Sequence, residues 1–504
     1  MSVARNVLAN FLGQGWAAVM NLAFIPVYIR FLGVEAYGLV GLLALLQAWF
    51  TLLDMGMTPT LNREMARFTA GIHSPQSIRN LLRSLEILCF GLAALIGASI
   101  WGSSGYLANN WLKAEALPAS VVAQAISLMA LVVALRFVEG IYRGSLMGLQ
   151  RQVWYNGANA ALATVRNGGA VLVLMWISAT TQAFFLWHAL VSILSVAILS
   201  SSVHRALPDA PSTPRFSFES LEGVWKFARG MIGISFVAFL LTQVDKVLLS
   251  RLLSLELFGY YTLATTLAGV TYMLVAPVTA ALFPSMVTLV TADDHSALTS
   301  MYHQGAQLVT VITAPAALLL CLFSGDVVFM WSGDAGLAAS TAPILSALVL
   351  GTFLNGLMWM PYQCQLAHGW TSLVLEGNIA GAAVLVPAIF WAVPHYGAIG
   401  AAWIWVAVNI GLILVVIPLM HRRLIPLEKW NWYIGDVLLP LCGAGAIVLL
   451  AMSLQPESYQ NRWHWLVFLS ITGCLALAGS AALADRFRPK LLAFILQGTG
   501  SDVR

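Results

Sequence analysis

Charged residues are scarce in this chain. Of its 504 residues, only 9% are Asp, Glu, Lys or Arg, while 60% are hydrophobic. Soluble domains carry about 25% charged residues, so this sequence cannot supply the polar surface that a soluble protein of its length needs. Disordered chains are poor in the apolar residues that dominate here. The composition therefore excludes both classes and predicts a polytopic membrane protein.

Paired cysteines and catalytic motifs are also lacking. The five cysteines are scattered without paired spacing, which predicts neither a disulfide framework nor a metal site. There is no paired-carboxylate, metal-ligand or nucleotide-binding motif. The loops expected outside the membrane are short, whereas a membrane glycan enzyme generally needs a sizeable outside loop or catalytic groups at the membrane surface. We therefore expect neither an enzyme nor a bound cofactor.

Long charge-free stretches are what the chain has instead. Four of them, at 167–203, 257–292, 335–375 and 377–421, are each long enough for two helices, because one helix crosses the hydrocarbon with about 20 apolar residues. The pattern predicts an all-α fold with about 14 transmembrane helices. We place the helices near 7–29, 36–57, 81–104, 119–142, 156–177, 182–203, 228–250, 259–286, 306–330, 341–362, 372–393, 397–420, 434–454 and 464–484.

The distribution of Lys and Arg predicts the orientation. With the N-terminus inside, 18 of the 25 basic residues lie in cytoplasmic segments, four lie outside and three lie within the membrane. This is the positive-inside bias of membrane proteins. Both termini are therefore expected in the cytoplasm. The bias also accounts for the net charge of +4 without a nucleic-acid partner.

An internal repeat relates two segments at an offset of 221 residues. Residues 30–38 (RFLGVEAYG) and 251–259 (RLLSLELFG) share Arg, Leu, Glu, an aromatic residue and Gly at identical spacing. Both segments fall in expected outside hairpins. Parallel repeats in transporters typically place the substrate site near the midplane between the halves. The alternative is that these residues only cap a hairpin, with glycine supplying the turn.

Polar side chains form a stripe along the first expected helix. Asn10, Gln14 and Asn21 fall on one face at 100° per residue. The repeat carries Gln14 to Ser235 and Asn21 to Thr242. Amides that face lipid would leave donors and acceptors unsatisfied. The stripes therefore face a watery cavity or, alternatively, hydrogen-bond neighbouring helices.

Ionisable residues within the spans are functional candidates because their insertion is costly. Arg136, Glu139 and Arg143 share one face of a helix, and Arg166 has no acid within two turns of its own helix. Arg136 and Glu139 could instead simply neutralise each other. Asp245, Lys246 and Glu376 lie in later spans. The arginines suit an anion, since a guanidinium is a planar fork matched to phosphate oxygens.

The chain resembles the polysaccharide flippases of the Wzx type, in the superfamily that includes multidrug extruders and lipid II flippases. The resemblance is carried by Pro26, Arg30, Leu32, Gly33, Tyr37, Gly38, Asp54, Gly56, Leu61, Arg63, Ala66, Asp245, Lys246, Gly259, Tyr260 and Tyr261. It implies two six-helix lobes that form a V around a central cavity, plus two C-terminal helices. The expected division is an N-terminal lobe at 1–203, a cytoplasmic linker at 204–227, a C-terminal lobe at 228–420, and the last two helices with a cytoplasmic tail at 421–504.

The resemblance also implies a function. The expected substrate is an undecaprenyl-diphosphate-linked oligosaccharide, moved by alternating access from the cytoplasmic to the periplasmic leaflet of the bacterial inner membrane. The expected partners are this lipid-linked glycan, membrane lipids and other glycan-assembly membrane proteins. An ion-coupled multidrug extruder of the same fold and, further away, a membrane glycan polymerase or ligase are the alternatives.

Each candidate residue then has an expected role. Arg136, Arg166 and Lys246 would contact the diphosphate, with Arg143 on the same path. The stripe of Asn10, Gln14 and Asn21 would lie near the sugar. Asp245, Glu139 and Glu376 are the candidates for coupling to proton or sodium entry.

Overall fold

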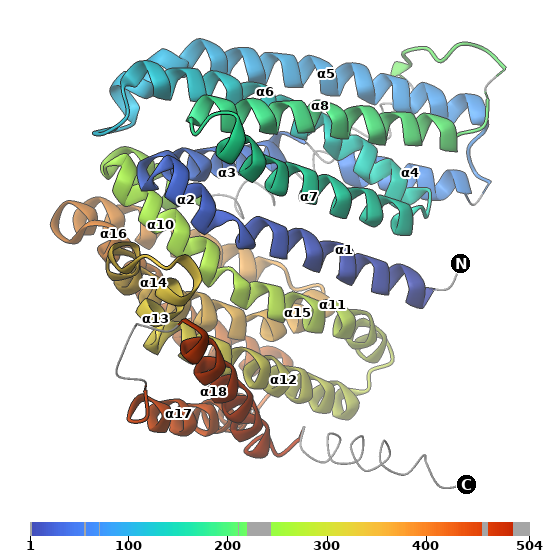
Figure 1. The fold of residues 1–504 in the computed structure, drawn as a ribbon. Coiled ribbons are helices and arrows are strands. Elements are labelled where there is room, and N and C mark those ends of the chain that lie inside the picture. The colour runs from blue at the N-terminus through green and yellow to red at the C-terminus, as the bar shows by residue number, and fades with distance from the viewer. Residues whose placement is uncertain are drawn as a thin grey trace, which may run out of the picture. The chain divides into compact units, whose positions relative to one another are not determined.

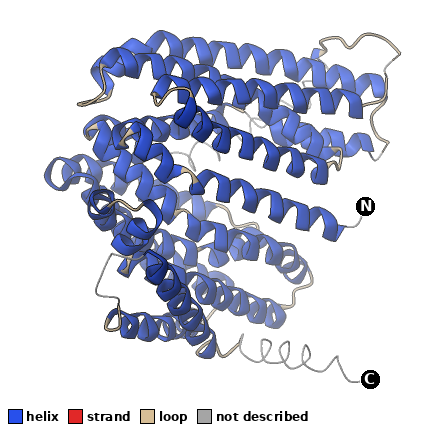
Figure 2. Ribbon diagram, viewed as in Figure 1, coloured by secondary structure: helices blue, strands red, loops and turns tan. Residues whose placement is uncertain are grey.

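The described part of the chain is helical, as Figure 2 shows. The computed structural model describes residues 3–54, 57–69, 71–209, 211–218, 243–455 and 462–486, with side chains described from residue 12 onward except at 50–53. No strand occurs among these residues. The all-α fold class is therefore confirmed. The chain divides into two compact units, residues 1–259 and 260–504.

The first unit is built around α6. Its elements are α1 (Val3–Ala23), α2 (Ile25–Leu32), α3 (Val34–Leu53), α4 (Met57–Thr69), α5 (Pro75–Tyr106), the π-helix η1 (Leu107–Trp111), α6 (Ala119–Gly148), α7 (Gln152–Trp176) and α8 (Thr181–Ala206), followed by helical residues 243–252. Helices α3, α4, α5 and α8 all pack against α6, and α1 packs along α7 (Figure 1).

Local sequence signals explain several helix ends in this unit. The first expected span, 7–29, is divided into α1 and α2 at Phe24, just ahead of Pro26, which lies near the start of α2. Gly33 then turns the chain into α3 with φ of 85°, a conformation that favours glycine. Ser74 caps α5 by accepting a hydrogen bond from the Ser77 amide at 3.1 Å. Helix α4, rich in polar residues, was not among the expected spans.

The second unit contains the remaining helices. They are α10 (Leu255–Ala268), whose first turn belongs to the first unit, α11 (Val270–Thr291), α12 (His295–Leu322), α13 (Ser324–Ser332), α14 (Ala335–Leu357), α15 (Trp359–Ala367), α16 (Ser372–Leu424), the π-helix η2 (Asn431–Leu438), α17 (Leu439–Met452) and α18 (Arg462–Ala482). Helix α12 packs against α11, α14, α17, α18 and η2. Gly397 interrupts α16 with φ of 60°, where the sequence predicts the boundary between two spans.

Eleven described helices are long and apolar enough to cross a membrane. One of them is Ser372–Leu424, which contains the break at Gly397. The shorter apolar helix Val34–Trp49 adds a further segment. Most of the expected span at 228–250 lies outside the described residues, as do Ser235 and Thr242 of its polar stripe. A polytopic membrane protein is therefore confirmed, while the count of 14 stays a prediction.

The glycines of the internal repeat make a reciprocal helix crossing within the first unit. A Cβ on Gly38 would lie 2.4 Å from the carbonyl oxygen of Leu255, and one on Gly259 would lie 2.5 Å from that of Val34. Both glycines are in the second turn of their helices, α3 and α10. The alternative in which glycine supplies the turn of a hairpin therefore does not apply to Gly38 and Gly259. They let two repeated helix starts touch backbone to backbone.

The start of the expected cytoplasmic linker is held against α5. The Arg79 guanidinium donates to the carbonyl oxygens of Pro208 at 2.8 Å and Leu207 at 2.9 Å. The Asn80 side chain accepts from the Arg215 amide at 3.0 Å. The segment that follows α8 is thus fixed to the first unit by side chains of α5. Residues 219–242 lie outside the described part, so the predicted division into lobes stays a prediction.

Candidate functional site

Helix α6 positions three charged side chains along one face. Arg136, Glu139 and Arg143 follow one another at spacings of three and four residues, which brings them to the same side of an α-helix. The opposite side of α6 packs through buried apolar residues such as Val138 and Ile141. The charged face therefore points away from that packing and toward a cavity.

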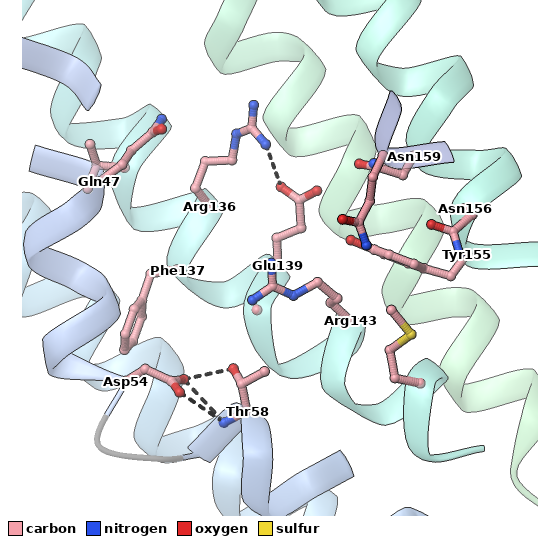
Figure 3. Close-up of a pocket in the computed structure, with 14 residues that line it drawn as sticks. Gln47, Asp54, Thr58, Arg136, Phe137, Glu139, Arg143, Tyr155, Asn156 and Asn159 are labelled. Atoms are coloured by element: carbon pink, nitrogen blue, oxygen red, sulfur yellow. Dashed lines mark hydrogen bonds and ion pairs between the residues drawn. The ribbon is translucent and has the colours of Figure 1, made fainter. Parts of the chain in front are cut away.

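The cavity has a volume of about 580 Å³ and lies entirely within the first unit. Helices α1, α4, α6 and α7 contribute to it, together with Gln47 of α3 and Asp54 after that helix. Its lining residues are Gln14, Gln47, Asp54, Thr58, Val133, Arg136, Phe137, Glu139, Gly140, Arg143, Met147, Tyr155, Asn156 and Asn159. Figure 3 shows the α6 charges in the middle, with Gln47 and Asp54 on one side and Tyr155, Asn156 and Asn159 on the other.

Arg136 and Glu139 form an ion pair inside the cavity. The Arg136 Nη1 to Glu139 Oε2 distance is 3.5 Å (Figure 3). Arg136 Nε and Glu139 Oε2 are nevertheless buried without a hydrogen-bond partner among the described residues. Leaving a buried charged group partly unsatisfied costs free energy. The ion pair therefore leaves part of the hydrogen-bonding capacity of both side chains unsatisfied.

Asp54 joins the cavity to the start of α4. Its carboxylate accepts from the Thr58 hydroxyl at 2.8 Å and from the Thr58 amide at 3.2 Å (Figure 3). Acceptors at a helix N-terminus satisfy amides that have no partner within the helix. This carboxylate thereby fixes α4 and places an anion at the cavity wall.

Four carboxamide side chains complete the polar lining. They are Gln14 from α1, Gln47 from α3, and Asn156 and Asn159 from α7. Gly13 explains how α1 comes so near, because a Cβ there would lie 2.7 Å from Cβ of Asn156. An amide offers both donors and an acceptor. This wall can therefore bind hydroxyl-rich groups such as sugars.

The formal charges of the lining residues cancel. Arg136 and Arg143 are balanced by Asp54 and Glu139. The cavity wall is therefore not basic overall, although its arginines suit an anion, because Asp54 and Glu139 lie in the same lining. The additional positive charge comes from Arg166, which interacts electrostatically with Arg136 and Glu139.

Arg166 is buried in α7 rather than exposed in the cavity lining. It is 7% exposed, and its Nη2 donates to the Ser195 hydroxyl at 3.1 Å. Its Nε has no hydrogen-bond partner among the described residues. No described carboxylate lies within ion-pair distance of this guanidinium. Arg166 is thus a buried guanidinium next to the cavity lining, and no described acidic side chain is in direct contact with it.

Those remaining predicted residues whose side chains the structure describes do not line this cavity. Asn21 accepts from the Asn167 side chain at 3.0 Å, which fits the alternative of hydrogen bonding between helices. Lys246 donates to Gln243 at 3.2 Å and lies 4.0 Å from Asp245. Glu376 is exposed near the start of α16 in the second unit. The side chain of Asn10 lies outside the described residues.

Sequence reasoning missed several lining residues that carried a visible signal. Gln47 is the one strongly polar side chain in its apolar run, and Asn156 and Asn159 are spaced to share a face of α7. Asp54 enters the sequence analysis only as one of the residues that carry the family resemblance. No sequence signal indicated that these residues, over 100 positions apart, would meet.

An all-helical membrane fold with a polar cavity between its helices is typical of polytopic membrane transporters. Solved structures share this fold. One, described as the lipid II flippase MurJ in an inward closed conformation, matches with a TM-score of 0.68 and 13% identity over 97% of this chain and 100% of that one. The MATE multidrug transporter DinF-BH matches with a TM-score of 0.59 and 14% identity over 82% and 94% of the two chains.

Sequence comparison then gives the family. The chain belongs to the family described as "Polysaccharide biosynthesis protein", whose model matches residues 27–340. A protein of Shigella flexneri named "Putative O-antigen transporter" is 20% identical over 426 residues, covering 84% of this chain and 99% of that protein. The resemblance to Wzx-type flippases is thereby confirmed. The relatives are transporters and flippases rather than enzymes, and the protein is a multi-pass protein of the inner membrane.

Proposed function

We propose that this protein moves an undecaprenyl-diphosphate-linked oligosaccharide from the cytoplasmic to the periplasmic leaflet by alternating access. The observation that carries the proposal is the cavity of the first unit, whose lining combines two arginines with four carboxamides. The family match, the Shigella flexneri relative named as an O-antigen transporter and the fold of a lipid II flippase support the same substrate class.

The substrate has parts with opposite solvent preferences. Its lipid tail can stay in the bilayer, whereas the diphosphate and the sugars need a hydrated path across about 30 Å of hydrocarbon. Arg136 and Arg143 offer guanidinium groups that bind phosphate oxygens through paired hydrogen bonds. Gln14, Asn156 and Asn159 offer amides to the sugar hydroxyls.

Charges outside the lining act at longer range. Arg166 raises the positive potential on the α7 side of the cavity without touching the ligand. Lys246 lies in the helix 243–252. It stays a candidate for contact with the diphosphate at the outward end of the path. In this scheme the substrate head meets Arg143 and Arg136 first and Lys246 later.

The membrane potential favours the outward step. Moving each negative charge outward gains about 2.3 kcal/mol per 100 mV when the inside is negative. The return of the empty carrier is then the step that an inward-moving cation can assist. Of the predicted coupling residues Asp245, Glu139 and Glu376, only Glu139 lines the cavity, so we favour it for ion entry there.

A multidrug extruder remains the second candidate. Asp54 and Glu139 place two carboxylates in the same cavity as the arginines. A cationic drug could pair with these acids, and a structure of a MATE multidrug transporter shares the fold. The two functions differ in what their loss causes, because only the flippase is needed for surface glycan.

The test is complementation of a deletion strain with Arg143→Ala. Losing a charge-assisted hydrogen bond costs about 1.5–3 kcal/mol, and each 1.4 kcal/mol is about tenfold in affinity. We expect about a tenfold or larger fall in surface glycan and accumulation of the lipid-linked intermediate, measured by mass spectrometry of extracted lipids.

Arg151→Ala is the matched control. Arg151 is exposed at the start of α7, close in sequence to the cavity but not part of its lining. This variant should support normal glycan export at the same protein level. Normal glycan but increased drug sensitivity in the deletion strain would support the extruder instead.

A further inference from the structure

A second cluster of titratable side chains lies in the second unit, apart from every residue singled out above. His303 of α12 and Asp436 of η2 are both 0% exposed. His303 Nδ1 is hydrogen-bonded to Asp436 Oδ2, and His303 Nε2 lies 3.0 Å from Glu428 Oε2. Glu428 lies in the segment between α16 and η2, and its side chain is 27% exposed.

Carboxylates flank both ring nitrogens of His303. Each ring nitrogen faces a carboxylate oxygen, and an ionised carboxylate can only accept. When both carboxylates are ionised, both nitrogens donate and the ring carries a positive charge. The two nitrogens point in opposite directions, so the two carboxylates and the ring do not converge on one point where a metal ion could be held. The three groups together carry one net negative charge.

The neighbouring His421 shows the contrast. Its Nδ1 faces the Ile417 carbonyl oxygen at 2.9 Å, and its Nε2 lies 3.2 Å from the Tyr302 hydroxyl. A donor at Nδ1 and an acceptor at Nε2 are both satisfied by the neutral ring. Of these two buried histidines, only His303 is placed between carboxylates.

Asp436 retains an unused acceptor in a buried position. Its Oδ1 has no hydrogen-bond partner among the described residues. A buried carboxylate with an unsatisfied oxygen is costly, because burial disfavours the charged form. Adding one proton from water forms an O–H bond on this carboxyl and changes the net charge of the three groups from −1 to zero.

Other titratable and charged groups surround the cluster, and they come from several elements. Helix α12 contributes Tyr302, α15 contributes Cys364, α16 contributes His421, the next segment contributes Lys429, η2 contributes Tyr433, and the end of α18 leads to Asp485 and Arg486. Lys429 and Arg486 lie toward Glu428 and His421, and Asp485 adds negative charge near Asp436.

Glu428 is held in its charged form. The hydrogen bond from Asn431, with contributions from the charges of His303 and Arg486, keeps the pKa of Glu428 below its ordinary value. A proton that enters the cluster is therefore not retained on the partly exposed Glu428 carboxylate. Asp436 is the carboxylate that remains to receive it.

The backbone supports a functional role for this position. Asp436 is carried by η2, a π-helical segment of eight residues, and π-helical turns are rare and frequent at functional sites. Gln307 of α12 donates to the Gly435 carbonyl oxygen at 3.1 Å and to Asp485, and accepts from the Arg486 amide at 3.1 Å. The junction of α12, η2 and the end of α18 thus depends on groups next to the proton-binding carboxylate.

We propose that Asp436, paired with His303 and Glu428, is a proton-binding site whose occupancy is coupled to the transport cycle. Proton binding weakens the charge pairing between α12 and η2 and so alters the junction that these elements form with the end of α18. The coupling rests on the proposed function, whereas the proton site does not.

Infrared difference spectroscopy of the purified protein tests the proton site directly. A step from about pH 8 to about pH 5, the range in which histidine-linked groups titrate, should produce the C=O band of a buried carboxylic acid. We expect Asp436→Asn to lose this band. Asp293→Asn is the matched control, since Asp293 is exposed with φ of 56°, a conformation that asparagine tolerates.

Glycan export of the same variants tests the coupling. We expect Asp436→Asn to lose the pH dependence of export that the wild type and Asp293→Asn retain. Persistence of the band in Asp436→Asn, or its absence from the wild type, would overturn the proton site. Loss of the band with an unchanged pH dependence of export would overturn the coupling. Because the spectra need no substrate, a failure of the proposed function does not affect them.

A second variant covers the case in which Asp436→Asn does not fold. Glu428→Gln keeps Asp436 and removes one negative charge close to the cluster. The band should then appear at lower pH than in the wild type, because a carboxylate without a negative neighbour binds its proton less readily. An unchanged midpoint would contradict the proposal.

Discussion

At the scale of single residues, the arginines of the first unit differ in what surrounds them. Arg136 is paired with Glu139, Arg143 is exposed at the cavity, and Arg166 is buried with a hydroxyl partner. A buried charge without an acid in contact is expensive to keep. Its presence indicates that the positive potential it adds has a use, which for the proposed substrate is attraction of the diphosphate.

Arg166 therefore supports a prediction. Arg166→Ala removes the potential behind the cavity and should lower glycan export about tenfold, while Arg166→Lys, which keeps the charge, should retain more of it. Surface glycan at matched protein levels is the measurement. The exposed Arg205→Ala in the last turn of α8 serves as control. Full export by both Arg166 variants would contradict an anion path past this helix.

At the scale of elements, the repeated motif is a contact between helix starts. Val34 and Leu255 begin α3 and α10, and each presents its carbonyl oxygen to the glycine four residues along the other helix. Nearby, the Glu35 carboxylate accepts from the amides of Glu115, Ala116 and Leu117 at 2.6 to 3.1 Å. The two helix starts are thus joined by backbone contacts that tolerate no added side chain.

The crossing can be tested by adding one methyl group. Gly38→Ala would place a Cβ 2.4 Å from a backbone oxygen, and overpacking of this kind costs about 1–3 kcal/mol. The melting temperature of the purified protein should fall. Gly91→Ala in α5 is the control, because nothing lies within 4 Å of its Cβ position and alanine favours helix over glycine. Equal melting temperatures for both variants would contradict a tight crossing.

At the scale of the whole molecule, the distribution of basic residues predicts the orientation of the chain in the membrane. Eighteen of 25 lie on one side of the predicted topology, and this bias sets how membrane proteins insert. The orientation decides which leaflet the flippase loads from. It is a property of the insertion process, so the helical packing of the described residues does not report it.

Reporter fusions test the orientation. A fluorescent protein after Arg504 should fold and fluoresce, whereas an export-dependent phosphatase there should be inactive, if the C-terminus is cytoplasmic. Lys113→Cys should react with an impermeant thiol reagent added to intact cells, and Arg151→Cys should not, both in a background without the five native cysteines. The reverse labelling pattern would invert the assignment of leaflets.

The sequence by itself determined the class of protein. Hydropathy and charge depend only on composition and order, so the helical membrane fold, most of the spans and the break at Gly397 could be predicted without contacts. The charged face of α6 was predictable for the same reason, since helical periodicity follows from local geometry. The spacing of the motifs likewise indicated the family.

Only the tertiary structure decided which groups meet. Asp54, Gln47 and Asn159 join the α6 charges because four helices and the end of α3 converge on one cavity, and Gly38 meets Leu255 over 200 residues away. His303 and Asp436 were overlooked because each lies near the end of an expected span, where a polar residue needs no explanation. Their pairing depends on long-range packing, which brings opposite charges together out of water and cannot be deduced from local periodicity.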